Sequence, residues 1–239
     1  AIEEAFSVRR AAAVAISINS PGGMPVQSTL IFKRIRALAA EKMLKVWVFV
    51  EDVAASGGYL IALAGDEIWA EDSSIVGSIG VVSASFGFDK LMERVGVERR
   101  IYTAGESKAM LDPFRPEDPR DVARLKALQG DVHASFIALV RERRGARLKG
   151  DDAALFNGEF WSGQKALDRG LIDGLGDMRS QLRKAYGDKV RLRLIAPSTG
   201  WLRAKLGLSA ALPSGGWRGF GEDAISAIEA RSLWSRFGL

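Results

Sequence analysis

Residues 46–64 read Val-Trp-Val-Phe-Val-Glu-Asp-Val-Ala-Ala-Ser-Gly-Gly-Tyr-Leu-Ile-Ala-Leu-Ala. Residues 46–50 are apolar and rich in β-branched and aromatic side chains, which favours a buried strand. Residues 60–64 are apolar again and predict a helix. Ser56 stands at the junction and is followed by two glycines. The stretch therefore predicts a strand, a tight turn and a helix, the unit from which parallel α/β sheets are built.

Two interpretations of Ser56 fit this junction. A serine in such a turn can act as a nucleophile, because the turn exposes the hydroxyl and the helix N-terminus offers free N–H groups to a developing oxyanion. The glycines after it allow another backbone to approach closely. A serine that merely caps a helix has the same sequence pattern. The stretch alone leaves both interpretations open.

The alternation of strand and helix continues along the chain. Strands are predicted at residues 13–18, 45–50, 67–70, 77–82 and 98–103, and helices at 28–40, after Ser56 and at 89–95. This repeated order implies parallel strands joined by helical crossovers. Further along, we expect a long helix at 120–144, a short helix within 161–170, a last strand at 190–195 and helical spacing at 222–237.

Composition limits the chemistry. The chain has 239 residues, of which 47% are hydrophobic and 26% charged, as in ordinary globular proteins. The absence of cysteine excludes thiol nucleophiles, disulfides and Cys-ligated metals, and a single histidine, His133, excludes a His-rich metal site. We therefore expect no metal and no cofactor. No stretch of 18 apolar residues is present, so no membrane span is predicted, and we interpret the chain, which begins with Ala1, as a soluble portion.

The net charge of +5 comes partly from basic residues gathered in the last third of the chain. Because the chain shows no nucleic-acid-binding module and no regular basic–aromatic alternation, we do not expect a nucleic-acid partner. A solvated basic face or attraction to anionic lipid explains the charge.

Two more loops follow predicted strands. Residues 19–23 read Asn-Ser-Pro-Gly-Gly, and residues 105–114 read Gly-Glu-Ser-Lys-Ala-Met-Leu-Asp-Pro-Phe. Because the carboxyl ends of parallel strands meet at one edge of a sheet, the Gly-Gly loop and Ser56 are expected to share that edge. Each can donate a backbone N–H to one oxyanion.

A serine nucleophile also needs a general base. His133 lies on a helical stripe beside Val132 and Phe136, which is typical of a packing residue. A lysine serves as a base where burial lowers its pKa from about 10.4 toward neutrality. Lys108, among apolar neighbours in a loop, is the candidate base, although an ordinary exposed lysine fits the same position.

Five motifs in order resemble the signal peptide peptidase A family, the S49 serine peptidases: residues 19–23, 55–59, 76–81, the Lys108 segment and 160–176. The resemblance runs over roughly residues 13–178 and implies a Ser/Lys dyad. By this resemblance Ser56 matches the nucleophile, Lys108 the general base and Ser78 a serine that orients the lysine.

The resemblance also implies an oxyanion hole and a binding segment for an extended peptide. The N–H groups of Gly22 and Gly57 would form the hole, with Gly23 as the alternative to Gly22. A peptide would lie along the segment that contains Met24 and Val26, paired by β-augmentation.

For the whole protein, the resemblance implies a Clp/crotonase-type α/β fold of repeated ββα units, with a mostly parallel sheet and a helical C-terminal part. Residues 1–190 would be the peptidase domain and residues 191–239 an amphipathic extension that contacts other subunits or a membrane. The family forms rings or domes in which the lysine can come from a neighbouring subunit. Its members are anchored in a membrane, face the periplasm or the outside, and cleave remnant signal peptides and other extended apolar segments.

Three rival interpretations stay open. An ATP-dependent Clp-type peptidase subunit would need a histidine shortly after Ser56, where the sequence has none. A crotonase-like acyl-CoA enzyme would use the two-amide hole without a serine nucleophile. A membrane-associated scaffold related to the peptidases would be catalytically silent.

Overall fold

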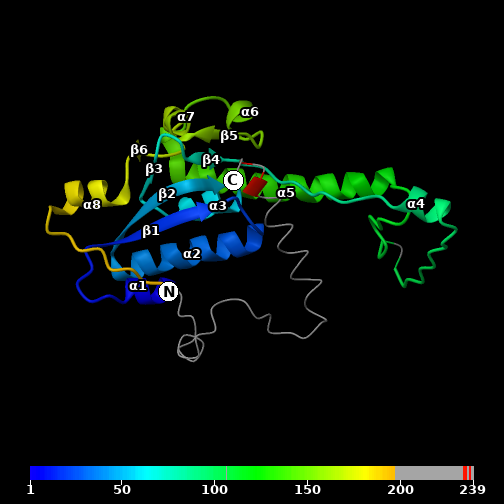
Figure 1. Cartoon of the computed structure of the whole chain (residues 1–239), viewed down its shortest axis with the longest axis horizontal. Helices are drawn as coiled ribbons and strands as arrows, with labels where there is room; N and C mark the ends of the chain where they lie inside the picture. The colour runs from blue at the N-terminus through cyan, green and yellow to red at the C-terminus, as the bar shows by residue number, and fades with distance from the viewer. Residues whose placement is uncertain (106, 197–233, 236, 238–239) are drawn as a thin grey trace.

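The structure, a computed structural model, describes residues 1–105, 107–196, 234, 235 and 237 (Figure 1). The N-terminal half contains α1 (Ile2–Phe6), β1 (Ala13–Ser20), α2 (Pro25–Lys42), β2 (Lys45–Ala55), α3 (Gly57–Ala62), β3 (Glu67–Ala70), β4 (Ile75–Gly77) and α4 (Asp89–Arg94). The rest contains α5 (Pro119–Arg144), a 3₁₀ turn (Gly145–Arg147), α6 (Asp152–Leu155), β5 (Phe160–Ser162), α7 (Gly163–Asp168), β6 (Gly174–Leu175) and α8 (Met178–Tyr186).

The described strands form one mixed α/β sheet that is mostly parallel. The central strand, β2, pairs in parallel with β1, β3 and β4, and β3 pairs in parallel with β6. Only β5 runs antiparallel, along β4. The parallel β-α-β order predicted from the sequence is therefore confirmed, and the carboxyl ends of β1, β2 and β4 lie at the same edge of the sheet.

The sheet is covered on both faces because the side chains of β2 alternate between two apolar clusters. Val46, Val48 and Val50 pack with residues of α2, α3 and α5 in the main core. Trp47 and Phe49 point the other way and pack against Leu182 of α8. A strand buried on both faces is an uninterrupted apolar run, which is why residues 46–50 predicted a buried strand.

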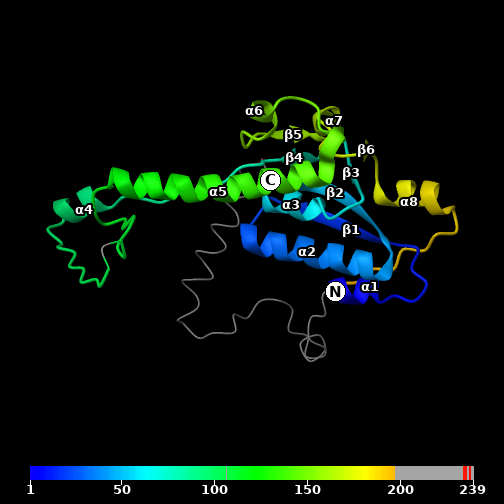
Figure 2. The ribbon, with the colours of Figure 1, turned by 180° about the vertical axis from the view of Figure 1, so that it is seen from behind.

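The segment between β4 and α5, together with the N-terminal part of α5, forms an arm that extends from the body of the molecule. Helix α5 has 26 residues and is therefore about 39 Å long. Only its C-terminal part contributes buried residues, Phe136, Val140 and Arg144. In Figures 1 and 2 its N-terminal part extends past the sheet, with α4 and the segment linking α4 to α5 at the far end.

Three predicted strands differ from the structure. Strand β4 covers residues 75–77 instead of 77–82. Residues 98–103 form no strand, because they lie in the arm, where no neighbouring strand is available for a hydrogen-bonded ladder. Residues 190–195 pair with no strand either. Of the helix predicted at 222–237, all but residues 234, 235 and 237 lie outside the described residues.

Candidate active site

The candidate site lies where β1, β2 and β4 end. The residues directly after these three ends are Pro21-Gly22-Gly23, Ser56 and Ser78. Strands β2 and β4 pair up to Ala55 and Gly77, so Ser56 and Ser78 leave neighbouring strands at the same level. The structure thus brings together the glycine loop and both serines predicted from the sequence.

Ser56 is held in an unusual backbone conformation, with φ 50° and ψ −121°. Its N–H donates to the Gly77 carbonyl at 2.8 Å, and its carbonyl accepts from the Leu60 N–H at 3.0 Å. A residue with a Cβ rarely adopts positive φ, and such strain persists only where the surroundings enforce it. The sharp turn from β2 into α3 is therefore set by backbone bonds on both sides of Ser56.

The hydroxyl of Ser56 does not cap the helix. Ser56 occupies the N-cap position of α3, yet its side chain makes no capping hydrogen bond. A capping serine has extended backbone angles and accepts from the second or third helical N–H. The interpretation of Ser56 as a helix-capping serine is therefore wrong. Its half-buried hydroxyl makes no hydrogen bond within the described residues.

The glycine loop packs directly against the turn at Ser56. A Cβ placed on Gly22 would lie 3.0 Å from Ser56 Cβ and 3.4 Å from Ser56 Oγ. A Cβ on Gly57 would lie 2.6 Å from Ser28 Oγ and 3.1 Å from the Gly23 nitrogen. Larger residues at these positions would push the two loops apart, so the glycines allow the close approach that the sequence suggested.

The backbone N–H groups that face this region differ in their bonding. The Gly22 N–H donates to Ser20 Oγ at 3.3 Å. Within the described residues, the N–H groups of Gly23 and Gly57 donate to no protein acceptor. Gly57 is the first residue of α3, where N–H groups have no partner inside the helix. The pair that is free to bind an oxyanion is therefore Gly23 and Gly57, and Gly22 joins it if the Ser20 hydroxyl turns away.

Ser78 and His133 lie beside this centre. Ser78 has φ 54°, and its N–H donates to the Glu159 carbonyl at 2.7 Å. His133 reaches from α5 to the Ile79 carbonyl, with Nε2 3.0 Å from the oxygen. Since a carbonyl only accepts, Nε2 must carry a proton and donate. His133 therefore fastens α5 to the loop after β4, which agrees with its interpretation as a packing residue.

Lys108 lies far from Ser56 in the same chain. Position 133 of α5 is at the site, and the helix continues for 14 residues toward Pro119, about 21 Å farther along its axis. The segment that carries Lys108 lies beside the first turns of α5, at the far end of the arm in Figures 1 and 2. Arg124 of α5 donates to Ser107 Oγ at 2.8 Å, and Asp121 of α5 accepts from the Leu111 N–H at 3.4 Å. The segment is also held there by the Arg99–Asp112 ion pair at 2.9 Å, and Lys108 is exposed. The single chain does not bring the predicted base to the predicted nucleophile.

The predicted binding segment is shorter than expected. Met24 has an extended backbone, with φ −65° and ψ 127°, but Pro25 begins α2. Backbone pairing with a peptide is therefore limited to residues 22–24, while Val26 lies in the first turn of the helix. Met24 and Val26 are 72% and 66% exposed, so their side chains are available for contact.

Arginines hold helix α3 in place from its other end. Arg143 of α5 donates to the carbonyls of Leu63 and Gly65 at 2.8 and 3.0 Å. Arg36 of α2 donates to the Ala64 carbonyl at 3.0 Å. Burial and the nearby Arg36 charge lower the pKa of Arg143 from its usual value. These contacts satisfy the carbonyls of residues 63–65, directly after α3, and fasten the end of the helix whose first N–H faces the site.

The motif at residues 170–176 connects three other elements of the fold through hydrogen bonds and an ion pair. Asp173 receives both terminal nitrogens of Arg144, at 2.8 and 3.0 Å, and its Oδ2 accepts from the Ile68 N–H at 2.8 Å. Burial alone would raise the pKa of Asp173, but the hydrogen bonds and charge of Arg144 outweigh it and lower the pKa. Tyr59 adds a buried bond to the Leu171 carbonyl at 2.7 Å. The motif joins α5, β3 and α3 and supplies no reacting group.

Two further residues lie at the site and were not among the predicted site residues. Ser28 is a buried polar residue of α2, and its Oγ lies 2.6 Å from the position that a Cβ on Gly57 would take. A single serine in a helix gives no sequence signal for such a contact. Phe160 of β5 pairs with Gly77, is 45% exposed and touches Phe237 with ring centroids 5.0 Å apart. Within the described part of the chain, no group of three or more His, Cys, Asp or Glu side chains is placed to hold a metal ion.

Comparison with known proteins identifies the family. The model of peptidase family S49 matches residues 38–190. The chain belongs to peptidase family S49. The matched range of this S49 chain includes Ser56, Gly57, Ser78 and Lys108, and it begins after the loop that contains Gly22.

Three relatives are longer proteins that this S49 chain matches over part of their length. A Brucella abortus protein named Na(+)/H(+) antiporter NhaA is 59% identical over 243 residues, which cover 100% of this chain and 33% of that protein. A Methanocaldococcus jannaschii protein named as a putative protease is 32% identical over 171 residues, 72% of this chain and 54% of that protein. The chloroplastic serine protease SPPA of Arabidopsis thaliana is 34% identical over 184 residues, 74% of this chain and 26% of that protein.

The chain therefore spans between about a quarter and about half of the length of these relatives. The name antiporter belongs to a Brucella protein about three times as long as this chain. The part of that protein that this chain matches corresponds to the peptidase family, because the S49 model covers residues 38–190 of this chain. Among the helices in the described part of the chain, none is long and apolar enough to cross a bilayer.

Proposed function

We propose that this chain is the catalytic portion of a serine endopeptidase with Ser56 as its nucleophile. The observation that supports this most directly is the state of Ser56: positive φ, a hydroxyl that makes no capping bond, and an adjacent pair of free N–H groups. This is the arrangement that acyl transfer needs, a nucleophile beside donors for an oxyanion. Membership of peptidase family S49 agrees with it.

The proposed chemistry is acyl transfer in two steps. A neutral lysine amine takes the proton of Ser56 Oγ while Oγ attacks the carbonyl carbon of the scissile peptide bond. The carbonyl oxygen becomes an oxyanion on the N–H groups of Gly57 and Gly23 or Gly22. The lysine returns its proton to the leaving amine, and the C–N bond breaks to leave an acyl ester on Ser56. Water, deprotonated by the same lysine, then releases the acid product.

We infer that Lys108 of a neighbouring subunit is this lysine. Lys108 lies at the end of an arm that points away from its own site, and it is exposed in the single chain. A lysine needs a desolvated position to be an effective base near neutral pH. Docking of the arm on another copy would supply both the burial and the approach to Ser56, with Ser78 placed to orient the amine. The apolar side chains exposed on the arm support such docking: Val82, Phe86, Leu91, Val95, Val97 and Tyr102.

The substrate in this proposal is an extended apolar peptide, such as a remnant signal peptide. Two observations support this substrate class: Met24 and Val26, which follow the glycine loop, are exposed apolar residues, and the exposed Phe160 pairs with Gly77, next to the end of β2. The overall fold is proposed to be of the Clp/crotonase type, with residues 1–190 as the peptidase domain and residues 191–239 as an extension. The full-length protein is proposed to be anchored in a membrane with this portion outside the cytoplasm.

The test is hydrolysis of casein at pH 8 by the wild type and by the variants Ser56→Ala and Lys108→Ala, with Lys126→Ala as a control. Lys126 is an exposed lysine of the same arm. We expect both site variants to be inactive with their oligomeric state retained, and the control to be unchanged. Activity should also rise toward alkaline pH, because the base must be unprotonated.

Mixing the two inactive variants distinguishes a shared site from a site within one chain. If Ser56 and Lys108 come from adjacent subunits, random mixed oligomers recover about a quarter of the wild-type activity. If both residues must come from one chain, the mixture stays inactive. Full activity of Lys108→Ala with loss in His133→Ala would revive the Clp-type alternative, and binding of CoA with Ser56 dispensable would favour the acyl-CoA enzyme. A wild type that forms the oligomer and cleaves nothing would favour the silent scaffold.

A further inference from the structure

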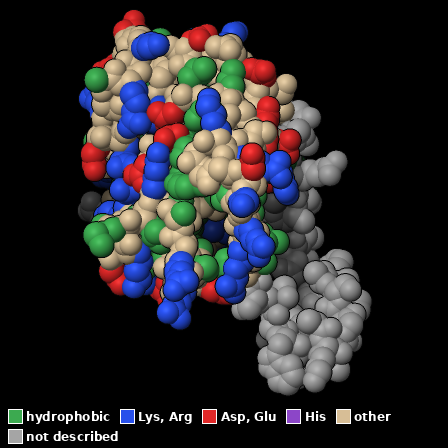
Figure 3. Space-filling model, turned by 90° about the vertical axis from the view of Figure 1, so that its left-hand side faces the viewer, with side chains coloured by type: hydrophobic (Ala, Val, Ile, Leu, Met, Phe, Trp, Pro, Cys, Tyr) green, Lys and Arg blue, Asp and Glu red, His purple; other side chains and the backbone are tan. Residues whose placement is uncertain are grey.

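Six basic residues gather at the end of the molecule that is opposite the candidate active site. Between Asp177 and residue 193 the chain carries Arg179, Arg183, Lys184, Lys189, Arg191 and Arg193. All six are exposed, and none forms an ion pair with another described residue. Figure 3 views this end of the molecule and shows Lys and Arg side chains crowded over its lower half, with hydrophobic side chains between them.

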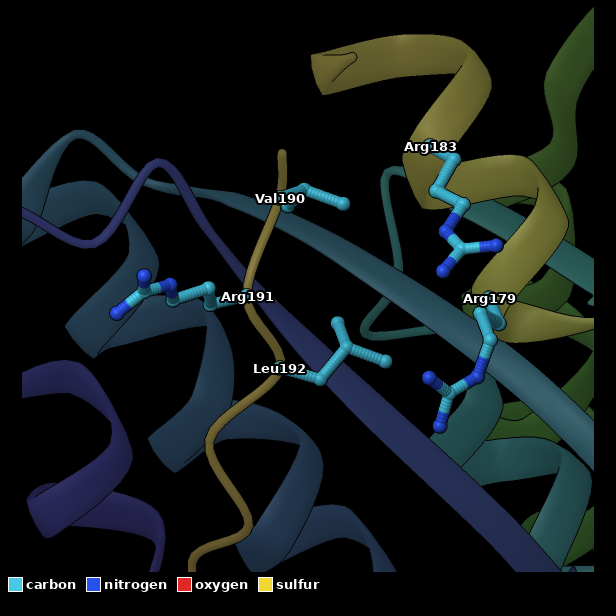
Figure 4. Close-up of a pocket in the computed structure, with 5 residues that line it drawn as sticks. All are labelled: Arg179, Arg183, Val190, Arg191 and Leu192. Atoms are coloured by element: carbon cyan, nitrogen blue, oxygen red, sulfur yellow. The ribbon is translucent and has the colours of Figure 1, made fainter. Parts of the chain in front are cut away.

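Two of these arginines line a pocket with a mixed wall. The pocket has a volume of about 370 Å³ and lies between α8 and the segment that follows it. Arg179 and Arg183 extend from α8 on one side (Figure 4). Val190 and Leu192 point toward them from the other side, while Arg191 points away across the segment. The pocket thus combines two guanidinium groups with two aliphatic side chains.

The folding of α8 keeps the two arginines together although their charges repel. Leu182 is buried against Trp47 and Phe49, which sets the rotation of the helix about its axis. Arg179 and Arg183 are four residues apart and therefore neighbours on the surface of the helix, an arrangement that disfavours the helix when both carry the same charge. Arg179 also lies in the first turn, where the helix dipole disfavours a cation. A bound anion would relieve both effects.

We propose that this pocket binds the phosphate headgroup of an anionic phospholipid at the surface of a bilayer. Arg179 and Arg183 are placed to hold the phosphate, because guanidinium groups match its oxygens. Val190 and Leu192 would contact the glycerol and the first methylenes. Leu194, which is 89% exposed, would enter the interface beside the headgroups. The aliphatic wall favours a lipid over a nucleic acid, which would be met by aromatic stacking platforms.

This placement leaves the candidate active site accessible. Helix α8 packs near the amino ends of β1 and β2, and the glycine loop follows the carboxyl end of β1. The eight residues of β1 separate the two ends by about 25 Å. A chain bound to a bilayer through α8 would therefore present Ser56 and the arm toward the solvent.

Flotation with lipid vesicles tests the proposal on the full chain. The wild type is compared with the triple variant Arg179→Gln/Arg183→Gln/Arg191→Gln, using vesicles of phosphatidylcholine alone or mixed with phosphatidylglycerol. The matched control is Lys126→Gln/Lys149→Gln/Lys165→Gln, which removes the same charge from three exposed, unpaired lysines elsewhere in the described part of the chain.

We expect the wild type to bind the mixed vesicles, to release them at high salt and to ignore phosphatidylcholine alone. The arginine triple should partition about 100-fold more weakly, since each basic residue near an anionic surface contributes about tenfold or less, and the lysine triple should change little. Leu194→Asn should weaken binding to vesicles further. Casein hydrolysis by the arginine triple should match that of the wild type, so the result does not depend on the peptidase proposal.

Three results would overturn the proposal. If the arginine triple and the lysine triple weaken vesicle binding equally, net charge alone accounts for the binding. Binding of millimolar glycerol phosphate that is lost in the arginine triple, without binding of the wild type to the mixed vesicles, would identify a site for a small soluble phosphate. Equally tight binding of duplex DNA, lost in the same arginine triple, would assign the face to nucleic acid.

Discussion

Replacing Gly57 with alanine tests how closely the glycine loop and the turn at Ser56 must approach. Gly57 is the first residue of α3 and does not require a left-handed backbone, so alanine can adopt its conformation. The added methyl would meet Ser28 Oγ at 2.6 Å and the nitrogen and oxygen of Gly23 at 3.1 and 3.2 Å. The Ser28 hydroxyl can rotate away, but the Gly23 backbone can only shift. The substitution should therefore displace an oxyanion donor without removing any hydrogen bond of the fold.

The expected loss of turnover in Gly57→Ala can be estimated from two known effects. Complete removal of an oxyanion donor lowers turnover by about 100- to 1000-fold, and a misplacement near 1 Å costs about 100-fold. A shift of a few tenths of an ångström at Gly23 should then lower turnover of Gly57→Ala by about 10- to 100-fold. The free energy of unfolding should fall by at most about 3 kcal/mol, because overpacking costs about 1–3 kcal/mol and alanine in place of glycine in a helix returns up to about 1 kcal/mol.

The assay is casein hydrolysis together with urea unfolding, with Gly130→Ala as the control. Gly130 also lies in a helix, α5, and a Cβ there would meet no atom within 4 Å. The control should keep full turnover and gain up to about 1 kcal/mol of stability. Turnover of Gly57→Ala within about twofold of the wild type would refute the reasoning, because it would show that Gly23 does not need its present position for catalysis.

Other substitutions test the framework around the site. Asp173→Asn should lower the free energy of unfolding by about 3 kcal/mol in urea titrations, because it leaves the buried Arg144 charge unpaired. Since the pKa of Asp173 is lower in the folded state, its contribution is complete at neutral pH and should be lost as the pH falls below about 3.9; an acid-unfolding curve of Asp173→Asn as steep as that of the wild type would contradict this. Gly170→Ala should prevent folding to a stable state, as judged by circular dichroism, because φ is +74° and the Cβ would lie 1.7 Å from the Arg147 carbonyl oxygen. His133→Ala should retain casein hydrolysis and lose about 1 kcal/mol of stability, and its inactivation as a folded protein would restore histidine as a base.

The sequence predicted the elements that are locally encoded. The strand at 67–70 coincides with β3, and the long helix predicted at 120–144 differs from α5 by one residue at its start. An apolar run and a helical stripe are properties of neighbouring residues, so they can be read without knowing the fold. The strand predicted at 98–103 failed because a β-rich segment becomes a strand only beside a partner strand.

What the sequence by itself determined is the order of strand, turn and helix around residues 46–64 and the meeting of Ser56 with the Gly-Gly loop at one sheet edge, since parallel strands place these ends together. Only the tertiary structure decided that Ser56 does not cap α3, that the Gly22 N–H already donates to Ser20, and that Lys108 lies at the end of an arm far from its own Ser56. The physical reason is that these features depend on distances between segments remote in sequence. Local periodicity reports which face of an element is buried, whereas packing decides what that face meets.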